Sequence, residues 1–281
     1  MRHYCLNLYE LFGYEKNGTT EGNLFAYLQA PIPAISTTRR RPAILIIPGG
    51  GYNTTSNREA EPIALPFLNA GYNAFILRYT CAPATFPVAL REACMAMRYI
   101  RENAAELDVD PTMVAAIGFS AGGHLCGTLG TMYDCPEVGD IGAPELLRPD
   151  ALCLGYPVAV AWGRTHDGTF RNISGGDPDL RMRLSIDKLA RADMPPTFLW
   201  HTRDDQGVPV RNSLILAQRL DELGVNFAMN IYNHGQHGLS TADEQVYNVN
   251  NMPQFSPTLP GWLRDTLSFF GEMGFKISDP E

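Results

Sequence analysis

The sequence lacks the features that mark several large classes of protein. Its 281 residues contain no run of 18 consecutive apolar residues, so no membrane-spanning helix is expected. The stretch after Met1 never becomes the apolar centre of a signal peptide, which predicts a cytoplasmic protein unless a leader has been removed. Lysine and arginine number 22 against 30 acidic residues. The resulting net charge of −8 disfavours nucleic acid and anionic membranes as partners.

Cofactor and metal signatures are also missing. The six cysteines include no C-x-x-C pair and are sparse for a disulfide-stapled protein, so reduced thiols are expected. No histidine or cysteine cluster has the spacing of a metal site. The glycine-rich residues 48–52 are followed by neither G-K-[ST] nor a G-x-G-x-x-G pattern, which argues against a phosphate-binding loop. We therefore expect a protein that works without metal or cofactor.

Strand and helix patterns alternate along the chain. No internal repeat and no Ser/Gly linker divides it, which predicts a single domain over residues 1–281. Short apolar runs predict strands at residues 24–28, 43–47, 74–79, 113–119, 151–157, 197–201 and 227–232. Helical patterns fall at residues 59–69, 88–103, 210–223 and 260–273. This alternation predicts an α/β fold with a central, mainly parallel sheet and helices on both faces.

A candidate nucleophile stands between one of these strands and a helix. Gly118-x-Ser120-x-Gly122 follows the strand at residues 113–119, and a helix is expected from Ala121. A serine exposed on such a tight turn needs small neighbours, because strand and helix approach closely there. A glycine- and serine-rich turn without chemical meaning is the alternative. The strand, turn and helix context favours the nucleophile.

A serine nucleophile needs a base and an orienting acid, and two later loops supply candidates. Residues 202–209 carry Asp204 and Asp205, and residues 233–238 carry His234 and His237. Each loop follows a predicted strand, at the edge where open α/β sheets build their sites. The composition of the loops leaves open which of the two aspartates is the acid and which of the two histidines is the base.

Donors for a developing oxyanion are expected from two places. Gly49, Gly50 and Gly51 follow a buried strand and present unhindered backbone N–H groups. The N–H of Ala121, directly after Ser120, is the other candidate.

Five segments together resemble the α/β-hydrolase superfamily, in the carbohydrate esterase branch that contains acetylxylan and feruloyl esterases. They are Pro48-Gly49-Gly50-Gly51-Tyr52, residues 118–125, residues 155–158, residues 198–209 and His234-Gly235-Gln236-His237-Gly238. The resemblance implies the α/β-hydrolase fold, with Ser120 as nucleophile, Asp205 as acid and His237 as base. Pro48 departs from lipase-like relatives, which often carry histidine there, and leaves the oxyanion donor among the three glycines unassigned.

Other residues receive more ordinary interpretations. Asp204 is expected to face solvent or to cap a turn, and His234 is expected to shape its loop. His124 is expected to pack or to hydrogen-bond within its helix, and His201 is expected to lie in the core. His3 and His166 carry no signal. The polar residues 162–179 form either a lid over the substrate or a surface excursion. Tyr52 and Trp162 are hypothetical stacking partners for a sugar ring.

The resemblance implies a serine esterase that removes short acyl groups, acetyl above all, from carbohydrate esters such as acetylated xylo-oligosaccharides. The expected partner is therefore a small-molecule or oligosaccharide ester, and the oligomeric state is not predicted. A general short-chain carboxylesterase and a prolyl-oligopeptidase-like peptidase remain alternatives, although no propeller-sized domain precedes this one. A non-catalytic binding protein of the same fold is a further alternative, which an intact Ser120, Asp205 and His237 disfavour.

Overall fold

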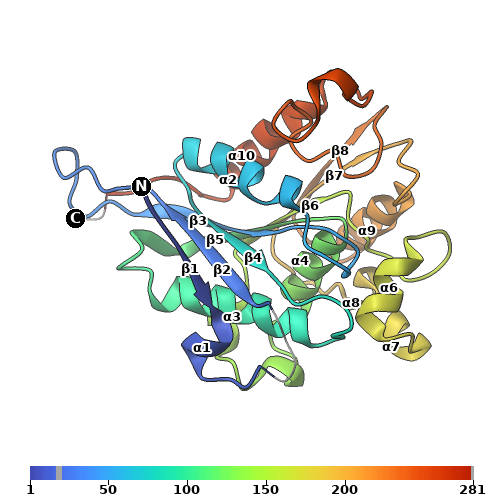
Figure 1. Cartoon of the computed structure of the whole chain (residues 1–281), viewed down its shortest axis with the longest axis horizontal. Helices are drawn as coiled ribbons and strands as arrows, with labels where there is room; N and C mark the ends of the chain where they lie inside the picture. Colours follow the sequence, from blue (N-terminus) through green and yellow to red (C-terminus); the bar gives the residue numbers. More distant parts are fainter. Residues whose placement is uncertain (17–20, 280–281) are drawn as a thin grey trace.

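The central feature of the fold is one twisted sheet. The computed structural model describes residues 1–16 and 21–279, and in this part eight strands pair in the order β1-β2-β4-β3-β5-β6-β7-β8 (Figure 1). The strands are β1 (Arg2–Asn7), β2 (Asn23–Leu28), β3 (Arg41–Ile47), β4 (Asn73–Arg78), β5 (Val109–Phe119), β6 (Ala151–Gly155), β7 (Thr197–Thr202) and β8 (Phe227–Tyr232). β1 and β2 are antiparallel to their neighbours, and the other pairs are parallel.

Helices cover both faces of this sheet. The α-helices are α1 (Leu8–Phe12), α2 (Glu61–Asn69), α3 (Val88–Glu102), α4 (Ala121–Met132), α5 (Pro144–Leu147), α6 (Asp167–Ser174), α7 (Pro178–Arg183), α8 (Ile186–Leu189), α9 (Arg211–Glu222) and α10 (Trp262–Glu272). Short 3₁₀ turns lie at Asn57–Glu59, Pro136–Val138, Val249–Asn251 and Leu259–Gly261. None of these described helices is long and apolar enough to cross a membrane.

The core has two layers because successive side chains of a strand point to opposite faces. Along β3, Leu45 and Ile47 join the cluster packed under α3, α4 and α9, whereas Ile44 and Ile46 join the cluster under α2 and α10. Figure 1 shows α2 and α10 on one side of the sheet and α3 on the other. All seven residues of β3 are buried, which explains its uninterrupted apolar run.

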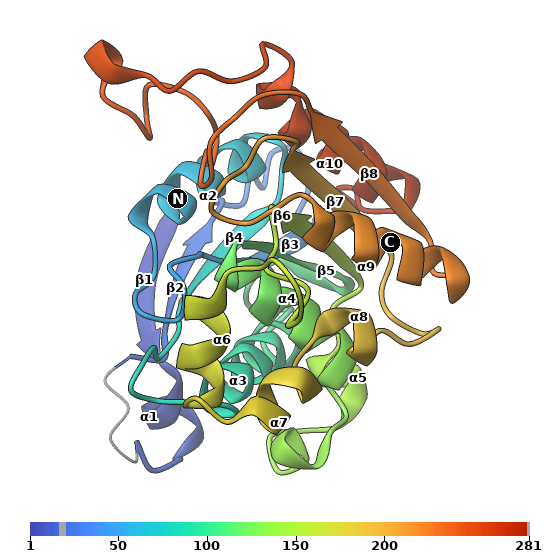
Figure 2. The same cartoon turned by 90° about the vertical axis from the view of Figure 1, so that its right-hand side faces the viewer.

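The expected fold is confirmed. A parallel core flanked by helices is present, and β8 has the bounds that the sequence predicts. The N-terminal hairpin partner β1 is an element that sequence analysis missed. The residues interpreted as a polar lid or excursion contain α6 and the start of α7, which lie on the side that faces the viewer in Figure 2.

Candidate active site

Ser120 lies on a strained turn between β5 and α4. Its backbone φ is 54° and its ψ is −119°, a conformation that residues with side chains rarely adopt. A Cβ on Gly118 would lie 2.2 Å from the carbonyl oxygen of Gly122, and one on Gly122 would lie 2.1 Å from that of Ile47. The two glycines are therefore required by the close approach of strand and helix around Ser120.

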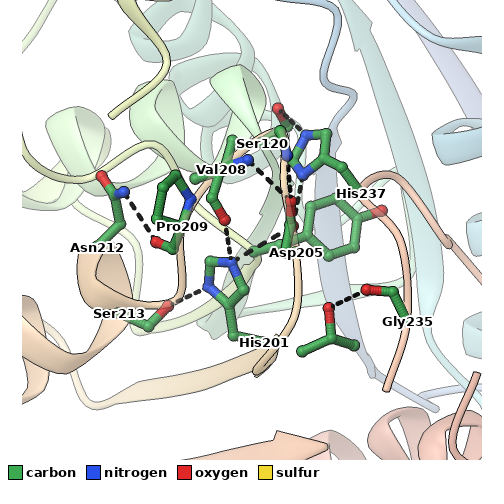
Figure 3. Close-up of polar contacts among 12 residues, drawn as sticks. Ser120, His201, Asp205, Val208, Pro209, Asn212, Ser213, Gly235 and His237 are labelled. Atoms are coloured by element: carbon green, nitrogen blue, oxygen red, sulfur yellow. Dashed lines mark hydrogen bonds and ion pairs between the residues drawn. The ribbon is translucent and has the colours of Figure 1, made fainter. Parts of the chain in front are cut away.

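Ser120, His237 and Asp205 form one chain of hydrogen bonds (Figure 3). The Ser120 hydroxyl donates to His237 Nε2 across 2.8 Å, and His237 Nδ1–H donates to Asp205 Oδ2 across 2.7 Å. These three residues come from the loops after β5, β8 and β7, whose carboxyl ends share one edge of the sheet. The arrangement has the geometry of a serine nucleophile, its base and an orienting acid.

Asp205 is held as a buried carboxylate. Its side chain accepts the backbone N–H groups of Gly207 and Val208 through Oδ1, each at 2.8 Å. Nε2 of His201 lies 3.5 Å from the other oxygen, Oδ2. Burial alone would raise the pKa of Asp205, but the hydrogen bonds from His201, His237 and the backbone outweigh it and hold the pKa well below its ordinary value. Asp205 is therefore ionised at any pH at which His237 works as a base.

The other member of each pair lies away from Ser120. Asp204 accepts from His234 Nδ1 at 3.0 Å and from the backbone N–H of Gly235 at 2.8 Å. This second carboxylate and imidazole thus bind each other at the surface and fasten the two loops together. Through these two hydrogen bonds, Asp204 holds the loop that follows β8 in place. This agrees with the loop-shaping role expected for His234, which is a residue of that loop.

The glycine loop after β3 has one N–H group already engaged. The backbone N–H of Gly49 donates to Oε2 of the buried Glu59 at 2.8 Å. Gly50 and Gly51 line the cavity in front of Ser120, with φ values of 130° and 67° that favour glycine. Ala121 begins α4, and the N–H groups of a first helical turn have no acceptor within the helix. Gly50, Gly51 and Ala121 therefore remain the candidate oxyanion donors, whereas the N–H of Gly49 is occupied by Glu59.

Glu59 joins this loop to the histidine side of the site. Its Oε1 accepts the hydroxyl of Tyr156 at 2.6 Å, and that hydroxyl oxygen accepts the backbone N–H of Ser240 at 3.0 Å. The Tyr156 ring packs edge-on against His237, with ring centroids 5.1 Å apart. Glu59 lies outside the motifs that the sequence offers. Tyr156 belongs to one of the family segments, residues 155–158, but the sequence does not indicate that its hydroxyl binds Glu59.

The cavity in front of Ser120 has a volume of about 350 Å³ and is lined by glycines and by residues with polar side chains. The residues lining it are Gly50, Gly51, Asn53, Ser56, Arg58, Glu59, Ser120, His166, Gly168, Asn172, His237 and Gly238. His166, which no sequence motif marks, therefore belongs to the site. Its Nδ1 accepts the N–H of Thr169 and so caps α6. Burial, together with the neighbouring His237, lowers the pKa of His166.

The structure does not support the two hypothetical sugar-stacking residues. Tyr52 is 1% exposed, and its hydroxyl pairs with His124 Nδ1 at 2.9 Å, so its ring is enclosed in the core. Trp162 is 39% exposed, but its indole N–H binds Asp187, the guanidinium of Arg211 stacks on its ring, and it is not among the residues lining the cavity.

Two of the remaining histidines, His201 and His124, are structural. His201 is completely buried between Ser213 and the carbonyl of Val208, as a core histidine was expected to be. His124 is packed as expected, 1% exposed and edge-on to the rings of Tyr52 and Phe170. Its Nε2–H donates outside its own helix, to the distant carbonyl of Leu184 at 2.8 Å. Across the described residues, no group of three or more metal-ligating side chains is found.

Comparisons with known proteins place these features in a family. The BD-FAE family model matches residues 31–141, and the prolyl oligopeptidase family model matches residues 162–258. The endo-1,4-beta-xylanase B of Butyrivibrio fibrisolvens is 35% identical over 84% of this chain and 37% of its own length. The acetylxylan esterase of Xylanibacter ruminicola is 28% identical over 79% of this chain and 45% of its own length. The chain thus spans less than half of these curated relatives.

A solved structure matches nearly the whole chain. The acetyl ester-xyloside bifunctional hydrolase from Caldicellulosiruptor lactoaceticus is 32% identical, with 98% of this chain and 97% of that chain covered and a TM-score of 0.82. The chain belongs to the α/β-hydrolase superfamily, in its carbohydrate esterase branch. The relatives and structural neighbours of this α/β-hydrolase include an acetylxylan esterase, a mycobacterial esterase and a carboxylesterase from Lactobacillus plantarum.

Proposed function

We propose that this α/β-hydrolase removes acetyl groups from carbohydrate esters, with acetylated xylo-oligosaccharides as the substrate class. The observation that carries the proposal is the continuous hydrogen-bonded chain from Ser120 through His237 to Asp205, which opens into a polar cavity. Relatives that bear acetylxylan esterase and acetyl ester-xyloside hydrolase names support the substrate class.

The chemistry follows from the positions of the atoms. Ser120 Oγ attacks the acetyl carbonyl carbon while its proton passes to His237 Nε2, and the charge on the carbonyl oxygen faces the N–H groups of Ala121 and of the Gly50–Gly51 loop. His237 then gives this proton to the departing sugar oxygen, which leaves an acetyl group on Ser120. Water, deprotonated by the same histidine, attacks that acetyl group and releases acetate. Asp205 holds the histidine tautomer and offsets the imidazolium charge throughout.

The surroundings of His237 favour a hydrophilic alcohol. The leaving oxygen must reach His237 Nε2, so the alcohol part of the substrate lies on the histidine side. A second groove of about 560 Å³ adjoins the same histidine and is lined by Asp204, Gln206, Gly207, His234, Gly235, Gln236 and Gln254. Amide and carboxylate groups of this kind suit the hydroxyl groups of further sugar units.

The peptidase alternative has one specific observation in its favour, the match of residues 162–258 to the prolyl oligopeptidase family. That segment contains the Asp205 and His237 loops, which ester and peptide hydrolases share. It therefore supports the triad geometry without separating the two reactions.

Hydrolysis of p-nitrophenyl acetate and of acetylated xylo-oligosaccharides, read as p-nitrophenol and acetate, tests the proposal. We expect both products from the native protein, and a loss of about 10⁴-fold or more in turnover for Ser120→Ala with an unchanged circular dichroism spectrum. Full activity in a folded Ser120→Ala protein would reject the mechanism. Cleavage of proline-containing peptides without release of acetate would favour the peptidase.

A further inference from the structure

One cation in the Ser120 cavity has no acidic partner. Arg58 lines the cavity and is exposed, and no carboxylate of the described residues lies within 4.0 Å of its guanidinium nitrogens. By contrast, most of the arginines around the protein surface form ion pairs, as Arg91 does with Asp140 and Arg181 with Asp167. A guanidinium beside a reactive serine is thus available to a ligand.

The position of this guanidinium is fixed by the residues that follow the catalytic histidine. Its central carbon lies 5.2 Å from the ring centroid of Tyr247, whose hydroxyl donates to the carbonyl of Gly238 at 2.8 Å. A Cβ on Gly238 would lie 3.5 Å from Arg58 Nη2, so the cation is in contact distance of the residue next to His237. Stacking and hydrogen bonding to Tyr247 hold the guanidinium in place, and because it carries five N–H groups, those not directed at Tyr247 can donate to a ligand.

The one carboxylate that lines the same cavity does not compete for Arg58. Glu59 is 4% exposed, and its two oxygens accept from the N–H of Gly49 and the hydroxyl of Tyr156. The negative charge of this side chain is therefore directed into the protein, away from the guanidinium.

A second possible donor, His166, lines the same cavity. The Thr169 N–H can only donate, so His166 Nδ1 must accept, and the proton of the neutral ring is then on Nε2. Among the described residues, none accepts a hydrogen bond from this Nε2–H. The cavity accordingly offers a guanidinium and a fixed imidazole N–H, two donors suited to an anionic oxygen.

We propose that Arg58, with His166 as a second donor, forms a binding site for a carboxylate on the substrate, and that the preferred sugars are acetylated oligosaccharides bearing a uronic acid. This inference rests on the proposed esterase function and narrows its substrate class. A single guanidinium matches a carboxylate because it donates two parallel hydrogen bonds and balances one negative charge.

Direct binding tests the site without relying on turnover. Isothermal titration of methyl glucuronide and methyl glucoside compares two sugars that differ only in a carboxylate or a hydroxymethyl group on the ring. We expect the glucuronide to bind about tenfold more tightly to the native protein, and Arg58→Gln to bring the two affinities together. Arg58→Lys should retain part of the difference, because it keeps the charge but not the paired hydrogen bonds. Arg264→Gln on α10, whose side chain is 83% exposed and outside the cavity, is the matched control and should keep the full difference.

A second experiment measures catalysis: it compares kcat/KM for acetate release from the monoacetylated forms of the same two sugars. The ratio of glucuronide to glucoside should exceed about ten in the native protein and fall towards one in Arg58→Gln. Equal affinities for the two sugars, or a preference for the glucuronide that Arg58→Gln leaves intact, would overturn the carboxylate site even if acetate is released from both. Tight, Arg58-dependent binding of glucuronide with no ester hydrolysis would instead uphold the site and overturn the proposed function.

Discussion

At the scale of single residues, the two neighbouring aspartates of the β7 loop differ in what surrounds them. Asp205 is 3% exposed and meets His237 and two backbone N–H groups, whereas Asp204 binds His234 at the surface. Adjacent residues of a loop often point apart, so only one carboxylate reaches the histidine beside Ser120. The same separation distinguishes His237 from His234.

This difference predicts unequal effects of matched substitutions. Asp205→Asn should lower kcat/KM for p-nitrophenyl acetate by about 10³ to 10⁴-fold, because an amide in place of the carboxylate favours the wrong tautomer of His237. Asp204→Asn should cost less than about tenfold, since its partner His234 lies outside the triad. The same contrast is expected between His237→Ala and His234→Ala. If Asp204→Asn proved the more damaging of the two aspartate variants, the acid would be misassigned.

Glu59 leads to a second prediction at this scale. Glu59→Ala leaves the Gly49 N–H and the Tyr156 hydroxyl without their acceptor, so the loop that carries Gly50 loses its anchor. We expect kcat for p-nitrophenyl acetate to fall about 10²-fold with little change in KM, because an oxyanion donor acts mainly in the transition state. Glu59→Gln, which keeps an acceptor for Gly49, should recover part of the loss. Glu61→Ala, an exposed neighbour on α2, is the control, and an equal fall in that variant would show that the effect is not specific to the anchor.

The residues that sequence analysis found and missed differ in how local their signals are. Ser120 stands out because its flanking glycines and its strand and helix are contiguous in the chain. The choice of Asp205 over Asp204, and of His237 over His234, needed the family resemblance. Which side chain of a loop points inward depends on the backbone of the folded loop, which the loop sequence alone does not reveal. His166 and Arg58 reach the cavity only through tertiary packing, and no pattern in the sequence encodes that approach.

At the scale of elements, α4 is fastened to two other segments by one buried histidine. His124 accepts the Tyr52 hydroxyl through Nδ1 and donates to the Leu184 carbonyl through Nε2, and it is 1% exposed. Burial is the main cause that lowers the pKa of His124 to about 4. The folded protein therefore resists protonation of this ring, while the unfolded chain takes up the proton near pH 6.5.

The sign of the resulting pH dependence follows from linkage. Because the folded pKa lies below the unfolded one, the stabilisation is complete above about pH 6.5 and is lost as the pH falls towards 4. The loss should be on the order of 3 kcal/mol in the free energy of unfolding. Urea unfolding at pH 7 and pH 4.5, compared between the native protein and His124→Gln, isolates this contribution from that of the carboxylates. An identical fall in both proteins would mean that His124 does not carry the effect.

Element boundaries show where sequence patterns stop being informative. β8 was predicted at its observed bounds, but β5 begins at Val109, four residues before the predicted run at residues 113–119. Arg41 pairs with Val109 and Ala43 with Val114, so a register shift accommodates the extra residues. β1 was missed because it is a short, largely exposed edge strand with little apolar alternation. Both cases depend on pairing with distant strands.

At the scale of the whole molecule, the parallel sheet brings distant parts of the chain to one edge. β3, β5, β7 and β8 end beside the glycine loop, Ser120, Asp205 and His237 respectively. The loop from β6 to β7 adds α6, which brings His166 and Asn172 to the cavity. Among the described residues that line this cavity none has an aliphatic side chain, so its hydrogen-bonding and charged groups are not flanked by the leucine, isoleucine or valine side chains that would receive a long acyl chain.

This polar lining predicts how the ester's acyl chain affects rate. Each methylene buried against apolar surface returns roughly 0.8 kcal/mol, but a methylene placed among these amide, imidazole and guanidinium groups gains little and displaces water that solvates them. A cavity of about 350 Å³ must also admit the sugar, which leaves little room for a long chain. We therefore expect kcat/KM to fall steeply from p-nitrophenyl acetate to butyrate to octanoate. Faster hydrolysis of octanoate than of acetate would show that an apolar acyl site exists elsewhere, and that acetyl esters are not the substrates for which this site is shaped.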